Sequence, residues 1–225
     1  MKVMASLAIK AAYLELAPAF ERSRGEKVET EWAGMVDIRK RLAAGEAPDA
    51  VIGSAALIDE LAAGGRLDAA SRVDIAKAQV GAAVRAGARK PDLGSVEAFK
   101  NALRTARSVV YSSGPSGVYL AQLFHDLGMA EELKSKAVQA PPGALVGERV
   151  ARGEFELCFQ QVPELAQVAG LDYVGPLPAE IQLTTVFSGA VHTSASRAGV
   201  AAALLGFLAS RDAQPVLRRH GLEPA

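Results

Sequence analysis

The sequence predicts an α/β protein of two lobes with mainly parallel sheets. Short apolar stretches alternate with amphipathic helical stretches along the 225 residues, which is typical of parallel strands joined by helices. Half of the residues are apolar and 22% are charged, so a sizeable core can form. The stretches 78–88 and 172–192 have little helical character and would cross between the lobes. We therefore expect lobe 1 at 1–79 plus 189–225 and lobe 2 at 80–188; a single doubly wound domain is the alternative.

The first lobe is expected to contain three strand–helix pairs. Pro18 should kink or break the first helix, because proline removes a hydrogen bond and crowds the preceding turn. Gly45 and the Gly64–Gly65 pair should end the second and third helices. The expected strands are 2–6, 27–33 and 49–54, and the expected helices are about 8–23, 35–45 and 55–65.

The second lobe should begin with the extended stretch 78–87. A helix over 95–106 has Ser95 as its cap and Glu97 early in its first turn. After it we expect strand 108–113 with a helix to about 124, helix 146–153, strand 155–161 and a β-rich stretch 171–192 that prolines interrupt. Two helices between 196 and 221 should complete the chain.

Charge and composition exclude several classes. Lys+Arg and Asp+Glu both number 25, so no basic excess indicates nucleic acid or an anionic membrane as a partner. No apolar run approaches the ~18 residues of a membrane span, so we expect no membrane insertion. The single cysteine, Cys158, excludes an internal disulfide and should be buried and inert. No export signal is visible, so the protein is expected in the cytoplasm if the chain is complete and in the periplasm if a signal was removed.

The stretch SVVYSSGPSGVYLAQLF, residues 108–124, has the bare backbone that an anion site needs. It places serines and glycines where a strand turns into a helix, and helix amino termini attract anions through unpaired N–H groups and the helix dipole. Ser113, Ser116 and Gly117 are therefore candidate ligand residues. The alternative is an ordinary turn in which Ser113 or Ser116 is the N-cap and Pro115 lies in the first turn.

A similar junction occurs at the start of the chain. Strand 2–6 ends in Ser6 and leads directly into a helix. Two such junctions facing each other could grip a small anion from both sides, because ligands of open α/β sheets lie beyond the carboxyl ends of the strands. Lys10, one turn into the helix, could lean toward that anion or be an ordinary surface lysine, and Trp32 could be a core aromatic or a lid.

Four segments, in order along the chain, resemble the molybdate-binding type of periplasmic solute receptors. They are ASLAIKAAYLELAPAFERSRGEKVE, RLAAGEAPDAVIGS, GPSGVYLAQLFHDLGM and LLGFLASRDAQPVLRRHGLEPA. The resemblance implies a two-lobed type II periplasmic-binding-protein-like fold that closes by a hinge on an anion in the interlobe cleft. It would place Ser6 and the backbone around Ser116 and Gly117 at the ligand.

The chain departs from molybdate binders at two places. Gly34 and Met35 stand in EWAGMVD where the family has hydroxyl side chains, and Gln161 replaces a ligand-contacting tyrosine. Unpaired ligand oxygens would cost about 1–3 kcal/mol each, which favours an organic acid over molybdate. The segments VGERVARGE and FQQ also resemble the aconitate isomerases, which have the same fold.

The expected function is therefore capture of a small anion, a di- or tricarboxylate or another oxyanion, without cofactor or metal. The partners implied are that ligand and an ABC-transporter membrane component, and we expect a monomer. The alternative is an aconitate-isomerase-like enzyme, for which Lys10, Tyr119, His192 and Glu164 are the candidate acid–base groups. A ligand-sensing module of a regulator is a third possibility, although no DNA-binding segment accompanies the lobes.

Overall fold

The computed structural model describes all residues, 1–225, and divides them into two compact units. Unit 1 contains Met1–Ala78 and Thr185–Ala225, and unit 2 contains Gln79–Thr184. No helix in either unit has the length and apolar character that crossing a membrane requires.

Unit 1 is built on three parallel strands with a helix after each. Strand β1 lies between β2 and β3, with Ser6 opposite Ala33 and Ala5 opposite Ile52. The first strand–helix pairs are β1 (Lys2–Ser6), η1 (Leu7–Ile9), α1 (Lys10–Arg24), β2 (Glu29–Ala33), α2 (Met35–Ala43), β3 (Ala50–Ser54) and α3 (Ala55–Ala63). The remaining elements are η2 (Ala69–Ser71), the start of β4 (Val73–Arg85), β9 (Thr184–Val191), α9 (Ala198–Leu208), α10 (Gln214–Arg219) and β10 (Glu223–Pro224). Strand β9 is antiparallel to β3, and β10 is antiparallel to β4.

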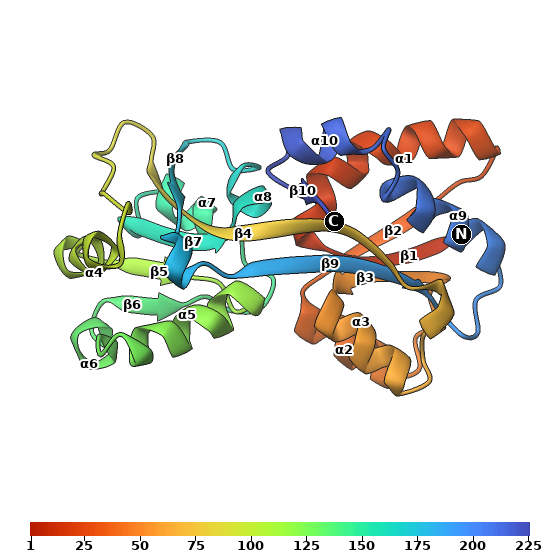
Figure 1. Cartoon of the computed structure of the whole chain (residues 1–225), viewed down its shortest axis with the longest axis horizontal. Helices are drawn as coiled ribbons and strands as arrows, with labels where there is room; N and C mark the ends of the chain where they lie inside the picture. Colours follow the sequence, from red (N-terminus) through yellow and green to blue (C-terminus); the bar gives the residue numbers. More distant parts are fainter. The chain divides into compact units, whose positions relative to one another are not determined.

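Helices cover both faces of this sheet, giving three layers (Figure 1). The face that carries Ala5 and Ile52 packs against α1, α9 and α10 and buries Phe20 completely. The face that carries Met4 and Val51 packs against α2 and α3. Because side chains alternate along a strand, a strand covered on both faces is buried throughout, as β3 is.

Unit 2 has the same three-layer plan. Strand β5 lies between β6 and β7 and is parallel to both, while β4 is antiparallel to β7 and β8. Its elements, after β4, are α4 (Val96–Thr105), β5 (Val109–Tyr111), α5 (Pro115–Asp126), α6 (Ala130–Leu133), β6 (Ala137–Gln139), α7 (Val146–Ala151), β7 (Leu157–Gln161), α8 (Val162–Leu165), β8 (Leu171–Pro176) and η3 (Ala179–Ile181). One face packs against α4, α5 and α6, where the rings of Phe99 and Phe159 meet edge to face with centroids 5.6 Å apart. Helices α7 and α8 cover the other face (Figure 1).

The predicted α/β fold class is confirmed, with four corrections of detail. The parallel strands in each unit are completed by antiparallel ones, so the sheets are mixed. Pro18 lies inside α1 and does not end it. The N-cap of α5 is Gly114, neither Ser113 nor Ser116, although Pro115 does occupy the first helical position. The short elements α6, β6, α8 and β10 were not predicted.

Candidate functional site

Three helices of unit 1 begin at the same edge of its sheet. Because β1, β2 and β3 are parallel, their last residues lie side by side, and η1 with α1, α2 and α3 start there. We call the strand ends and first helical turns at Ser6, Gly34 and Ser54 the carboxyl edge of unit 1. Unpaired N–H groups and the positive ends of helix dipoles collect at such an edge. The first turns of α1 and α3 contain no acidic side chain that would neutralise the positive ends of these helix dipoles.

Ser6 and Ser54 are helix caps. The Oγ atom of Ser6 accepts a hydrogen bond from Ala8 N at 3.3 Å, and that of Ser54 accepts one from Leu57 N at 3.4 Å. A serine hydroxyl that accepts still has its own O–H to donate. The Ser6 prediction as a ligand donor is therefore compatible with its capping role.

Lys10 is the first residue of α1, at the carboxyl edge of unit 1. Its Nζ atom lies 5.8 Å from the centroid of the Trp32 ring, within the range of a cation–π interaction. Trp32 is in turn held edge-on by Tyr13, whose hydroxyl accepts a hydrogen bond from Thr30. Lys10 takes part in none of the ion pairs of the structure. A cation is unfavourable at a helix amino terminus unless an anion joins it, so its placement favours a ligand role.

Met35 is the first residue of α2, and its side chain contacts the start of α3. Its Sδ atom accepts a hydrogen bond from Ser54 N at 3.4 Å and would lie 3.3 Å from a Cβ atom on Gly53. Gly34, the N-cap of α2, offers no side-chain donor. This part of the edge is therefore apolar and poor in hydroxyl donors.

In unit 2 the ends of β5 and β7 also lie side by side, and we call this the carboxyl edge of unit 2. Ser112 follows β5, and its Oγ atom lies 2.8 Å from the Oγ atom of Ser116 in a buried hydrogen bond. The structure thus brings Ser113, Ser116 and Gly117 to one turn, with α5 starting at Pro115. No acidic side chain lies in the first turn of α5.

Gly117 packs directly against the end of β5. A Cβ atom at this position would lie 1.5 Å from the carbonyl oxygen of Ser112, which no structure can accommodate without a shift. Glycine is therefore required here by the contact of the helix with its own strand. Its predicted role at a ligand stays a prediction.

Gln160, Gln161 and Glu164 complete the carboxyl edge of unit 2 at the end of β7. The Gln160 side chain accepts from Val146 N at 3.1 Å, at the start of α7. Gln161, a predicted ligand residue, is buried and is the N-cap of α8. Burial raises the pKa of Glu164 to about 7, although hydrogen bonds from the Gln160 side chain and the Gln161 backbone act against that rise.

The ring of Tyr173 lies at the same edge. A Cβ atom on Gly81 would lie 2.7 Å from this ring and 2.9 Å from Val162, the first residue of α8, so only glycine leaves room for the ring. The Tyr173 side chain is still 42% exposed. Its surroundings raise the pKa of the phenol by desolvation.

Two predicted acid–base candidates do not suit a site at the carboxyl edges. His192 N donates to Asp49 O at 3.0 Å, at the amino end of β3, so His192 lies at the opposite edge of the unit 1 sheet from Ser54. The hydroxyl of Tyr119 donates to the carbonyl of Ile181 at 2.9 Å, which occupies its proton. Both residues make structural hydrogen bonds in this arrangement.

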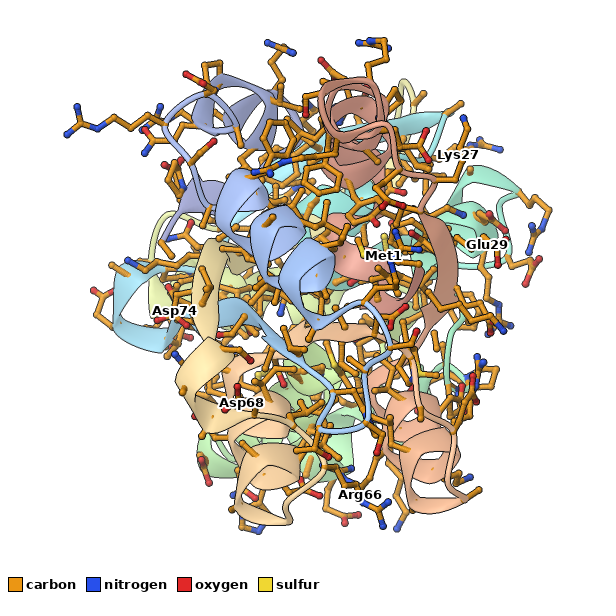
Figure 2. The ribbon with its side chains drawn as sticks, turned by 90° about the vertical axis from the view of Figure 1, so that its right-hand side faces the viewer. Met1, Lys27, Glu29, Arg66, Asp68 and Asp74 are labelled. Atoms are coloured by element: carbon orange, nitrogen blue, oxygen red, sulfur yellow. The ribbon has the colours of Figure 1, made fainter.

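The amino edge of unit 1 is closed by internal hydrogen bonds. Figure 2 shows Met1, Lys27 and Glu29 gathered where β1 and β2 begin; the Met1 amino group donates to Lys27 O at 2.8 Å. Arg66 and Asp68 lie on the segment between α3 and β4 in the same view. Burial alone would raise the pKa of Asp49, yet hydrogen bonds, chiefly from Lys2 N and Arg197 N, hold it below its ordinary value. This edge has no set of helix amino termini comparable with that at the carboxyl edge of unit 1.

Cys158 is buried in β7, as predicted, and burial raises the pKa of its thiol to about 12. A thiol with this pKa is not a nucleophile at neutral pH. No group of three or more His, Cys, Asp or Glu side chains is arranged to hold a metal ion.

Sequence reasoning missed Ser54, Ser112 and Tyr173. Ser54 could have been found, because it repeats the pattern of Ser6: a serine that ends an apolar strand and starts an apolar helix. Ser112 and Tyr173 carried no such signal. The position of Ser112 depends on its hydrogen bond with Ser116 of α5, and that of the Tyr173 ring depends on its contact with Gly81, which is distant along the chain.

Two three-layer α/β units, with helices starting at one edge of each sheet, are the architecture of the periplasmic binding proteins. The chain belongs to the family of bacterial extracellular solute-binding proteins, whose family model matches residues 1–223. It is similar to the periplasmic molybdate-binding protein of Azotobacter vinelandii, with a TM-score of 0.81 and 18% identity over 99% of this chain and 98% of that one. It is also similar to the sulfate-binding protein SubI of Mycobacterium tuberculosis H37Rv, with a TM-score of 0.80 and 19% identity over 100% of this chain and 86% of that one.

A curated relative is much closer in sequence. The aconitate isomerase of a Pseudomonas species is 40% identical over 230 residues, which cover 100% of this chain and 87% of that protein. The two structural neighbours support the fold.

Proposed function

We propose that this protein binds a small organic polycarboxylate, of the di- or tricarboxylate class, through the carboxyl edges of its units. The observation that carries the proposal is Lys10, a cation without an ion-pair partner, at an edge where three helices begin. An anion there would gain from the charge of Lys10 and from the N–H groups of the first turns.

The chemistry of the edges favours carboxylates over tetrahedral oxyanions. Met35 and Gly34 supply no hydroxyl donor, whereas a thioether and the Trp32 ring suit the carbon skeleton of an organic acid. The relative's name supports the same class, because aconitate is an unsaturated tricarboxylate. A receptor of this family would pass its solute to an ABC-transporter membrane component, which is the partner we propose for that role.

Calorimetry against trans-aconitate, cis-aconitate, sulfate and molybdate tests this proposal. We expect an aconitate to bind at least about tenfold more tightly than molybdate, a difference of about 1.4 kcal/mol. Lys10→Met should weaken that binding by about tenfold or more, because it removes the charge and keeps a side chain of similar length. Lys90→Met, on a loop of unit 2, is the matched control and should bind normally. Tighter binding of molybdate or sulfate, or normal affinity in Lys10→Met, would contradict the proposal.

Ser6→Ala is expected to weaken binding of the same carboxylate by about 1–2 kcal/mol, since one hydrogen bond to a charged group is lost. Ser95→Ala is the control, because the Ser95 Oγ atom accepts from Ala98 N at 3.1 Å and caps α4 in the same way. Both variants should lose some thermal stability, but only Ser6→Ala should lose affinity. Equal affinities in the two variants would show that Ser6 is a cap alone.

A second candidate function is isomerisation of such a ligand. The 40% identity with an aconitate isomerase over the whole chain favours it. Incubating the purified protein with trans-aconitate and following the cis isomer by NMR tests it directly. Binding without conversion would leave the receptor function as the conclusion.

A further inference from the structure

Glu164 lies at the carboxyl edge of unit 2. It is the third residue of α8, immediately after β7. The parallel neighbour β5 ends beside β7 and leads to the start of α5. Glu164 therefore shares one edge with the Ser112–Gly117 turn and with the exposed ring of Tyr173.

Hydrogen bonds hold the Glu164 carboxyl group in a defined orientation. It accepts from the side chain of Gln160 and from the backbone N–H of Gln161. The second bond is that of a capping box, in which the third residue of a helix reaches back to the N-cap. A purely structural role is therefore the alternative that any test must separate.

The surroundings of Glu164 make it a base near neutral pH. Its pKa is raised to about 7 by burial, and no neighbouring charge contributes to that rise. The charged residues of the adjacent helix α7 and of the turn that follows it pair with one another: Arg149 with Glu154, and Arg152 with both Glu148 and Glu154. On the adjacent strand β8, the phenol of Tyr173 has a pKa raised from an already high value, so it stays protonated at neutral pH.

The other candidate acid–base groups have positions or partners that do not suit proton transfer at this edge. His192 lies at the opposite edge of unit 1, the Tyr119 hydroxyl donates to Ile181, and Cys158 is buried in the sheet. Lys10 is the cation that the carboxylate-binding proposal requires. Of the four acid–base candidates predicted from the sequence, Glu164 is the one that remains at the carboxyl edge of unit 2.

We propose that Glu164 is the catalytic base that moves a proton of a bound unsaturated tricarboxylate; this rests on the second candidate function above. Its carboxylate takes a proton from the methylene carbon next to the double bond, and the electron pair of that C–H bond becomes the new double bond. The old double bond opens, and the same carboxyl group gives the former vinyl carbon either this proton or a solvent proton that has exchanged with it. One C–H bond breaks and one forms, so the step needs no oxidant, reductant or cofactor.

Glu164→Gln tests this assignment, because glutamine keeps an oxygen that can accept from Gln161 N and cannot exchange a proton as a base. Conversion of trans-aconitate and uptake of solvent deuterium into it are followed by NMR in deuterated buffer. We expect both rates to fall by about 10²-fold or more in Glu164→Gln, with affinity for trans-aconitate within about threefold of the original. Glu148→Gln, on α7, is the control and should keep both rates.

The pH profile supplies an independent readout. In the unaltered protein kcat/KM should rise with pH through about 7, as the carboxyl group ionises, and Glu164→Gln should lose this dependence. Rates in Glu164→Gln within about threefold of the original would overturn the proposal. A protein that binds trans-aconitate but neither converts it nor exchanges its protons would overturn this proposal and the isomerase function, and would leave the binding function standing. Failure to bind any carboxylate would overturn the binding function as well.

Discussion

Gly117→Val is expected to destabilise the protein by about 3 kcal/mol or more, a larger effect than most single substitutions produce. A Cβ atom at this position would lie 1.5 Å from the carbonyl oxygen of Ser112 and 2.3 Å from its carbonyl carbon. Both are backbone atoms, so no side-chain rotation relieves the clash. Either α5 must move away from the end of β5, or the turn must rearrange.

The sequence made Gly117 a candidate ligand residue, and that role predicts loss of ligand binding in Gly117→Val. The structure instead predicts loss of stability first, with any loss of binding following from the displaced turn. Urea unfolding of Gly117→Val and Gly117→Ala measures the effect. Gly114→Ala is the control in the same turn, because a Cβ atom at Gly114 meets no atom within 4 Å, and it should cost less than about 1 kcal/mol. Equal stability of Gly117→Ala and Gly114→Ala would show that Gly117 does not pack against the Ser112 carbonyl group as described.

The contribution of Glu164 to stability is expected to fall by about 3 kcal/mol at most as the pH rises from below 4.5 to above 7. Its pKa is about 7 in the folded protein and 4.5 in an unfolded chain, so the folded state binds the proton more tightly. Between these values the folded state holds more protons than the unfolded state, and the free energy of unfolding therefore decreases with pH. The full contribution is present below pH 4.5 and is lost as the pH passes through about 7.

Comparing the unaltered protein with Glu164→Gln isolates this contribution. Carboxylates whose pKa is lowered, such as Asp49, change stability with pH in the opposite direction, but they are common to both proteins. Urea unfolding at pH 5 and pH 8 should therefore show Glu164→Gln gaining stability relative to the unaltered protein as the pH rises. A constant difference between the two proteins would mean that Glu164 titrates in its ordinary range.

Local signals made the strand–helix pairs of unit 1 predictable. Strands β1 and β3 are short apolar runs that each end in a serine, and the helices that follow begin at once. Ser95 was predicted as a cap from the same kind of signal. The elements that were missed, such as β6 (Ala137–Gln139), are too short and too exposed to produce a periodic pattern.

What the sequence by itself determined is the α/β class, most of the elements, and the two junctions at Ser6 and at Ser113–Gly117 where strands turn into helices. These depend on the spacing of apolar residues and on caps, which act over a few residues. The tertiary structure alone decided that Met35 contacts Ser54, that His192 lies at the opposite edge of unit 1 from Ser54, and that Gly117 is required by Ser112. It also decided the raised pKa of Glu164, because burial depends on which elements pack around a carboxyl group, and strand pairing sets that packing between residues far apart in the chain.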